Sequence, residues 1–91
     1  MKWDESKRQV NHIKHGLDFF DADCVLESEF RLDIETIRNN EQRTQSFAYV
    51  FNFLAVLSVV HTGKEQRIIS FRRASREERE VYHEWLANEF D

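Results

Sequence analysis

Residues 53–60 read Phe-Leu-Ala-Val-Leu-Ser-Val-Val, and this stretch decides the fold because only Ser58 in it is polar. A strand that is apolar on both faces is typical of the interior of a sheet that is covered on both sides. We therefore place residues 53–60 as the central strand. The sequence Thr-Gly-Lys-Glu at residues 62–65 then predicts a hairpin turn, and residues 67–71 form the strand that returns beside it.

Two further strands are predicted before this hairpin. Apolar and charged side chains alternate over residues 30–35, which is the period of a half-buried strand. A polar link at residues 38–41 separates this strand from a second one at residues 45–51. Together with the central strand and its returning partner, they predict a meander of four antiparallel strands.

The chain begins with signals for two helices. Asp4 is a good N-cap for a helix that runs to about His15, and Gly16 follows directly as a typical residue after a helix end. Asp18 can cap a second, shorter helix that extends to about Leu26. We expect both helices to pack apolar side chains against the sheet.

The closing element is a helix that opens at a capping box, in which Ser75 is followed three residues later by Glu78. The complete order predicts an α+β fold with two N-terminal helices, a four-stranded antiparallel sheet and a C-terminal helix. A length of 91 residues is close to the usual size of one domain. Residues 1–91 are therefore expected to form a single domain.

Composition narrows the class of protein further. Hydrophobic residues make up 41% of the chain and include eight Phe, which is enough apolar surface to exclude a disordered protein. The N-terminus is charged and every apolar run is broken by polar residues, so we expect neither a signal peptide nor contact with a membrane. The single cysteine, Cys24, cannot form an internal disulfide, which fits a reducing compartment. We therefore expect a cytoplasmic location.

Charge is distributed unevenly around the net value of −4. Residues 18–35 carry seven acidic side chains and one basic, which is typical of a solvated face. Residues 61–79 carry six basic side chains against three acidic, and the arginines gather where a strand ends and a helix begins. Such a patch can bind phosphate groups even on a protein that is acidic overall.

No metal site is expected, because the histidines and the cysteine are scattered without C-x-x-C or H-E-x-x-H spacing. The candidate chemistry instead involves His61 and the arginines that follow it. A histidine with an ordinary pKa of ~6.5 beside guanidinium groups can serve phosphodiester transfer. The arginines would neutralise the phosphate, and a neighbouring 2′-hydroxyl would be the nucleophile. The alternative interpretation is that these arginines are surface ion-pair partners.

Regular strand alternation predicts which side chains lie on each face of the returning strand, residues 67–71, and of the residues that follow it. One face would carry Arg67, Ile69, Phe71 and Arg73, and the other Ile68, Ser70 and Arg72. A four-residue hairpin would also place His61 directly opposite Gln66 and beside Arg67.

Several short motifs, in order along nearly the whole chain, resemble the BrnT family of toxins. They are Trp3-Asp4-x-x-Lys7, Asn11-x-x-Lys14-His15-Gly16, Phe19 and Ala22, Glu41-x-Arg43, Val59-Val60-His61-Thr62, Arg67-Ile68-Ile69-Ser70-x-Arg72-Arg73-Ala74, and Glu78-Arg79-x-x-Tyr82. The most specific are the K-H-G and R-I-I-S-x-R-R-A segments.

The resemblance implies a RelE-like ribonuclease fold, cleavage of RNA without a cofactor, and neutralisation by a cognate BrnA-type antitoxin. By position, the residues that match the family's basic cleft are His61, Arg67, Arg72 and Arg73. The resemblance implies that these four residues are catalytic. Arg43 matches on a neighbouring strand and implies substrate binding. Lys14 and His15 match the end of the family's first helix, where their role could be substrate binding or structural.

A second hypothesis is a binding module that holds a partner protein or RNA without cleaving it. The acidic stretch at residues 18–35 and the sequence Thr-Gln-Ser-Phe-Ala at residues 44–48, where the family usually has a glycine, favour this alternative. Direct binding of DNA is a weaker hypothesis, because no helix-turn-helix is predicted and the closing helix is acidic. In a toxin–antitoxin pair, we expect contact with DNA through the antitoxin only.

Overall fold

The computed structural model describes residues 2–62 and 67–90 of the chain. Of the hairpin turn predicted at residues 62–65, only Thr62 lies within the described residues. In chain order, the elements are β1 (Lys2–Trp3), α1 (Glu5–His15), η1 (Phe19–Asp21), α2 (Asp23–Leu26), β2 (Leu32–Arg38), β3 (Glu41–Val50), η2 (Phe51–Phe53), β4 (Ala55–Thr62), β5 (Arg67–Arg73) and α3 (Arg76–Phe90).

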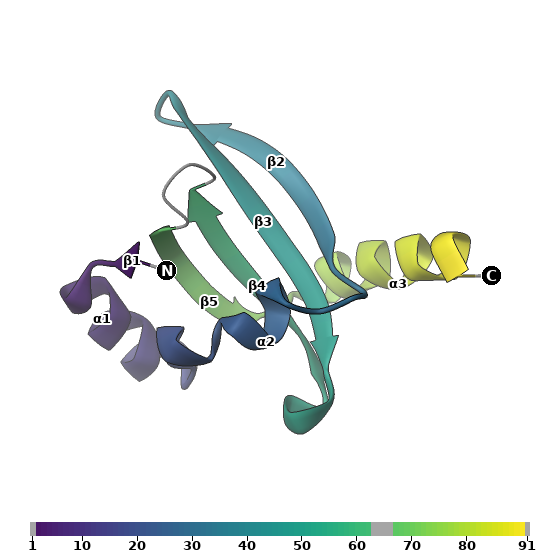
Figure 1. Cartoon of the computed structure of the whole chain (residues 1–91), viewed down its shortest axis with the longest axis horizontal. Helices are drawn as coiled ribbons and strands as arrows, with labels where there is room; N and C mark the ends of the chain where they lie inside the picture. Colours follow the sequence, from purple (N-terminus) through teal and green to yellow (C-terminus); the bar gives the residue numbers. More distant parts are fainter. Residues whose placement is uncertain (1, 63–66, 91) are drawn as a thin grey trace.

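The strands form one five-stranded sheet in the order β1-β5-β4-β3-β2 (Figure 1). The antiparallel meander from β2 to β5 confirms that part of the prediction. The prediction of a purely antiparallel, four-stranded sheet is wrong, because β1 pairs in parallel with β5 through Lys2 and Trp3. A strand of two residues is too short to show the alternation from which strands are predicted.

The hairpin between β2 and β3 is tighter than the predicted polar link. Only Asn39 and Asn40 separate the two strands, and both have left-handed backbone angles, with φ values of 54° and 63°. Two such residues form the turn whose twist matches that of a β-hairpin, and asparagine tolerates this conformation better than most residues. Consequently β2 extends to Arg38, and β3 begins at Glu41 rather than at Gln45.

The predicted ends of the first helix are confirmed. The Asp4 carboxylate accepts hydrogen bonds from the backbone N–H groups of Ser6 and Lys7, and Gly16 follows the helix with a φ of 70°. The second predicted helix is split, because the Asp18 side chain caps only a single 3₁₀ turn, η1, before the four-residue α2. The helical content is therefore one long N-terminal helix and two short turns, rather than two full helices.

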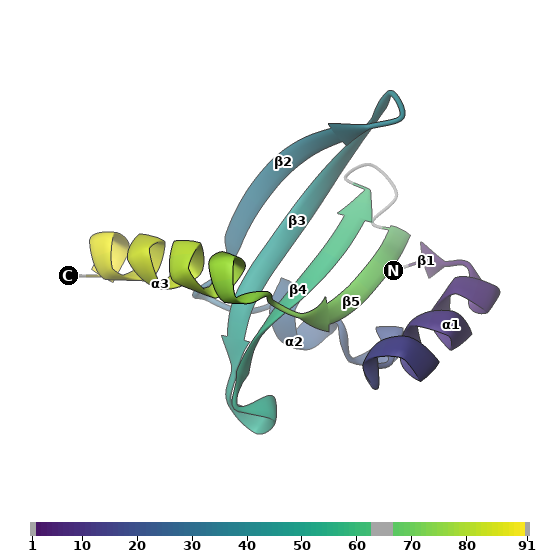
Figure 2. The ribbon, with the colours of Figure 1, turned by 180° about the vertical axis from the view of Figure 1, so that it is seen from behind.

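Helices lie on both faces of the sheet. Figure 1 shows α2 in front of the sheet and α3 behind it, and Figure 2 shows α3 in front. We name these two faces the α2 face and the α3 face. The main core lies on the α2 face and includes Phe19, Val25, Ala48, Leu57, Val59, Ile68 and Phe71. A smaller cluster lies beneath α3 and contains Phe47, Val56, Ala74 and Tyr82.

Helix α3 covers only one end of its face. In Figure 2, β3, β4 and β5 extend well past the helix toward the hairpin between β2 and β3. Helix α1 lies beside β5 at the edge of the sheet, and both views show it there. The uncovered part of the α3 face is therefore bordered by α3 at one end and by α1 along one side.

The pairing of β4 with β5 contains a register shift. Val60 pairs with Ser70, but the next residue, His61, pairs with Ile68, so that Ile69 is an extra residue in β5. The expectation that His61 lies opposite Gln66 is wrong. The expected alternation along β5 is also wrong, because an extra residue moves every side chain beyond it to the other face.

Asn11 fixes α1 to β5 from a buried position. Its side-chain amide donates to the backbone oxygens of Leu17 and Phe71, at 3.2 and 2.7 Å, and its Oδ1 accepts from the Phe71 N–H at 3.1 Å. The Asn11 side chain thus satisfies both the N–H and the C=O group of Phe71 in β5. This contact determines where α1 lies relative to the sheet.

We predict that Asn11→Ala lowers the free energy of unfolding by about 2–3 kcal/mol, because it leaves buried backbone groups without partners. Gln9→Ala, at an exposed position on the same helix, is the matched control and should change stability by less than about 0.5 kcal/mol. Urea unfolding monitored by circular dichroism measures both values. Equal stability of the two variants would contradict the role given to Asn11.

Candidate functional site

The register shift brings arginines together on the α3 face. Arg72 pairs with Ser58 and Arg67 with Thr62, and both partners lie on the α3 face of β4. The two arginines are five residues apart, so regular alternation would place them on opposite faces. They are separated by roughly 13 Å along the sheet, since their partners are four positions apart in β4.

Arg43 joins this group from β3. Its Nε lies 3.0 Å from one oxygen of the Glu41 carboxylate, and Nη2 of Arg67 lies 3.3 Å from the other. One carboxylate thus holds two guanidinium groups side by side at the uncovered end of the α3 face. Because all three side chains are partly exposed, a ligand on this surface can reach the arginines.

Arg72 is held by Glu78, from the first turn of α3. The two guanidinium nitrogens Nη1 and Nη2 lie 2.7 and 2.9 Å from the two carboxylate oxygens of Glu78. Glu78 also accepts from the Ser75 N–H at 2.7 Å, which confirms the capping box, and from the Gln45 amide at 3.0 Å. The Arg72 hydrogen bonds, followed by that from Ser75, lower the pKa of Glu78 from its ordinary value of 4.5 to about 2.

The pairing leaves one side of the Arg72 guanidinium group available. Glu78 occupies the end formed by Nη1 and Nη2, while the Nε–H and the second Nη2–H have no partner among the described residues. These two donors point the same way and can bind two oxygens of one phosphate group. Arg72 is thus both fixed in position and able to accept an anionic ligand.

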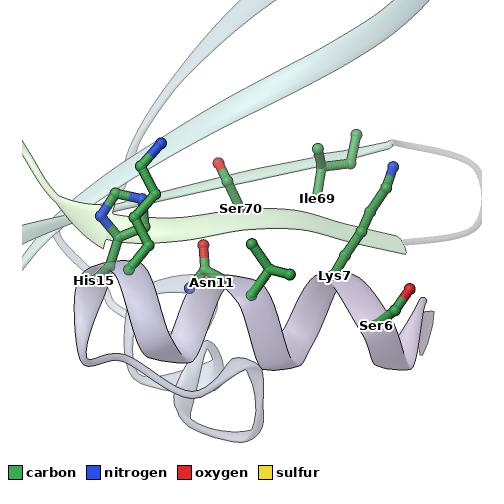
Figure 3. A pocket seen from close by; sticks show the side chains of 8 residues that line it. Ser6, Lys7, Asn11, His15, Ile69 and Ser70 are labelled. Atoms are coloured by element: carbon green, nitrogen blue, oxygen red, sulfur yellow. The ribbon is translucent and has the colours of Figure 1, made fainter.

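A pocket of about 320 Å³ lies between α1 and β5. Figure 3 shows Lys7, Asn11 and His15 on the side of α1 that faces β5, with Ile69 and Ser70 across from them. Partial burial lowers the pKa of His15, and the positive charges of Lys14 and Arg72 lower it further. His15 is therefore mainly uncharged at neutral pH, when an imidazole can accept a proton.

His61 lies on the α2 face, away from the arginines. Its ring Nε2 is 2.9 Å from the Ser46 hydroxyl, which in turn donates to Asp33 at 2.6 Å. The residue is only 8% exposed, and its Nδ1 is buried without a hydrogen-bond partner among the described residues. Burial lowers the pKa of His61, although the negative charge of Asp33 opposes this effect.

The sequence-predicted residues therefore divide between the two faces. The structure brings Arg43, Arg67, Arg72, Lys14 and His15 to the α3 face or to the side of α1 that borders it. It places His61 and Arg73 on the α2 side of the sheet, since Arg73 pairs with Leu57 of the main core. The expected grouping of His61 with Arg67 and Arg72 is wrong, because His61 shares a face of β4 with Leu57 and Val59, whereas both arginines pair with residues of the other face.

Three residues of this region were missed from the sequence. Glu78 holds Arg72 in place, Gln45 donates a hydrogen bond to Glu78, and Lys7 lines the pocket beside α1. The capping box predicted a structural role for Glu78 but gave no sign that the same carboxylate reaches β5. Lys7 was detectable from its spacing, because it lies seven residues before Lys14 and hence on the same side of α1.

Within residues 2–62 and 67–90, no group of three or more His, Cys, Asp or Glu side chains is arranged to hold a metal ion. Among the same residues, no helix is long and apolar enough to span a membrane.

An α+β fold that exposes arginines on a sheet face, beside a helix carrying lysines, is typical of proteins that bind the phosphates of nucleic acids. Over residues 3–78 the chain matches the family described as ribonuclease toxin, BrnT, of type II toxin-antitoxin system, and the chain belongs to this family. Membership supports a ribonuclease toxin with an antitoxin as its partner. Comparison with curated proteins gave no match.

We predict that Glu78→Gln lowers the free energy of unfolding at pH 7 by about 1–3 kcal/mol, because a half-buried charge on Arg72 loses its partner. The folded-state pKa of Glu78 lies below its ordinary value, so the stabilisation is fully present above pH 4.5 and is lost as the pH falls toward about 2. The difference between parent and variant should therefore shrink across this range.

The control for this prediction is Glu80→Gln, which removes an exposed carboxylate that lies 3.5 Å from Arg76 on the same helix. This change should cost less than about 0.5 kcal/mol. Urea unfolding at several pH values measures both variants. A Glu78→Gln protein as stable as the parent at pH 7 would show that the ion pair contributes nothing.

Proposed function

We propose that this chain is an endoribonuclease toxin that cleaves RNA on the α3 face without a metal ion. The observation that carries the proposal is the grouping of Arg67, Arg72 and Arg43 on one uncovered sheet face, next to His15. Membership of the BrnT family supports the same activity. We further propose that the fold is RelE-like and that the chain acts in the cytoplasm.

In the proposed reaction, the scissile phosphate lies against the free side of the Arg72 guanidinium group. The neighbouring 2′-hydroxyl attacks the phosphorus and loses its proton to the uncharged His15 imidazole. The bond from phosphorus to the 5′-oxygen breaks, and this oxygen takes a proton from water. The products are a 2′,3′-cyclic phosphate and a 5′-hydroxyl end, and neither oxidant nor metal takes part.

Electrostatic stabilisation by Arg72 contributes most of the rate in this proposal. Its guanidinium group is already oriented by Glu78, so little reorganisation is needed as negative charge develops on the phosphate oxygens. Arg67 and Arg43 bind the RNA backbone on the same face. His61 supports the fold through its contact with Ser46 rather than the chemistry, and Arg73 lies outside the site.

The partner in this proposal is a BrnA-type antitoxin that covers the basic face, and contact with DNA occurs only through that antitoxin. The α3 face would be blocked in such a complex, which would explain inhibition without any change in the toxin. The alternative, a module that binds RNA without cleaving it, is favoured by the pairing of Arg43, Arg67 and Arg72 with carboxylates. The two functions differ in whether bound RNA is cut.

We predict that the purified chain cleaves RNA in the presence of EDTA, and that Arg72→Ala slows cleavage by about 100-fold or more. His15→Gln should slow it by about 100-fold, because the change removes the proposed proton acceptor. Cleavage is measured on labelled RNA by gel, and the chemical nature of the new ends by mass spectrometry. Circular dichroism verifies that each variant is folded.

Two variants serve as controls for the same assay. Arg76→Ala removes an exposed arginine of α3, and His61→Gln changes the histidine on the α2 face, so both should cleave within about threefold of the parent. A His61→Gln protein that is folded but inactive would overturn the assignment of the α3 face. RNA that is bound but stays intact would favour the non-catalytic module.

A further inference from the structure

The pocket between α1 and β5 is lined by positive and hydroxyl-bearing side chains that the proposed chemistry does not use. Lys7 and Lys14 come from α1, and Ser70 comes from β5. The two lysines are seven residues apart, so they lie on one side of the helix and about 10 Å apart along its axis. Figure 3 shows Lys7, Ile69 and Ser70 around the opening of the pocket.

The charges of this pocket are not neutralised from within the protein. Among the described residues, no carboxylate lies within ion-pair distance of Lys7 or Lys14, whereas Arg43, Arg67 and Arg72 are all paired. The Ser70 hydroxyl likewise has no hydrogen-bond partner among them. An anionic ligand would therefore gain the lysine charges without displacing an existing ion pair.

The rest of the lining is apolar and partly uncovered. Ile69 is the extra residue of β5, and both Ile69 and Ser70 line the pocket rather than belonging to the main core. Val10 lies across from Ile69 and is 63% exposed. A pocket lined by cations and by branched apolar side chains fits a nucleotide, whose phosphate is anionic and whose base is flat and largely apolar on its faces.

The pocket lies close to Arg72 along β5. Ser70 lines the pocket, and Ser70 and Arg72 pair with Val60 and Ser58 on the same face of β4, so they are roughly 7 Å apart along the strand. A strand whose phosphate lies on Arg72 can therefore place an adjacent nucleotide between α1 and β5.

We propose that the pocket between α1 and β5 binds a nucleotide that flanks the cleaved bond, with its phosphate on Lys7 and Lys14 and its base against Val10 and Ile69. This inference rests on the proposed cleavage of RNA on the α3 face. The pocket positions the strand and determines how long an RNA must be to bind well. Lys7, Lys14 and Ser70 are thus binding residues rather than catalytic ones.

The test uses the full chain and two RNA substrates, a long single strand and a dinucleotide that contains only the cleaved bond. The double variant Lys7→Gln, Lys14→Gln should raise KM for the long strand by about 10-fold or more. On the dinucleotide, the KM of the same variant should stay within about twofold of the parent's. Lys2→Gln, which removes an exposed lysine from β1, is the control and should change neither substrate by more than about twofold.

Binding of a long RNA that carries 2′-O-methyl groups, and so cannot be cut, separates this inference from the proposed function. Fluorescence anisotropy at several salt concentrations should show that the double variant binds this RNA more weakly than the parent. The slope of log K against log salt concentration should also be smaller in magnitude, by about 0.7 for each lysine that contacts a phosphate. If the double variant binds this RNA as tightly as Lys2→Gln does, the pocket assignment is overturned. If binding weakens as expected but the parent cuts no RNA, the pocket assignment stands and the proposed cleavage fails.

Discussion

The one extra residue in β5 decides which side chains meet on this protein. Because Ile69 is inserted between the pairs Val60–Ser70 and His61–Ile68, Arg67 and Arg72 point to the same face of the sheet. Ile69 itself lines the pocket beside α1, next to Ser70. A regular β5 would place the two arginines on opposite faces of the sheet, so the basic α3 face depends on this irregularity.

Glu78 then connects this face to the fold. One carboxylate caps α3 through Ser75, accepts from Gln45 on β3 and holds Arg72 on β5, so three separate elements are joined at one point. The pairing reduces the net charge of the face but leaves the Nε–Nη2 side of Arg72 free for an anion. The ion pair therefore weakens the electrostatic attraction for RNA, but it also holds the Arg72 guanidinium group in a fixed orientation.

Local signals in the sequence predicted the elements well. The caps at Asp4 and Ser75 and the central strand each depend on neighbouring residues, and the structure confirms them, although β4 begins at Ala55 because Phe53 and Leu54 belong to the turn before it. The tightness of the turn at Asn39 and Asn40 and the short β1 were missed because their signals span only two residues. The grouping of His61 with Arg67 was wrong for a different reason: a bulge depends on pairing between strands, and nothing within β5 itself reveals it.

The central claim is that RNA binds the α3 face, from the arginines to the side of α1. Titration of ¹⁵N-labelled protein with 2′-O-methyl RNA, followed by two-dimensional NMR, tests it most directly. The account predicts that the largest shifts fall on Arg43, Gln45, Ser70 and Arg72, with small shifts at Asp33, Ser46 and His61 on the opposite face. Large shifts around His61 and Ser46, with Arg72 unaffected, would contradict the account and place the RNA on the α2 face.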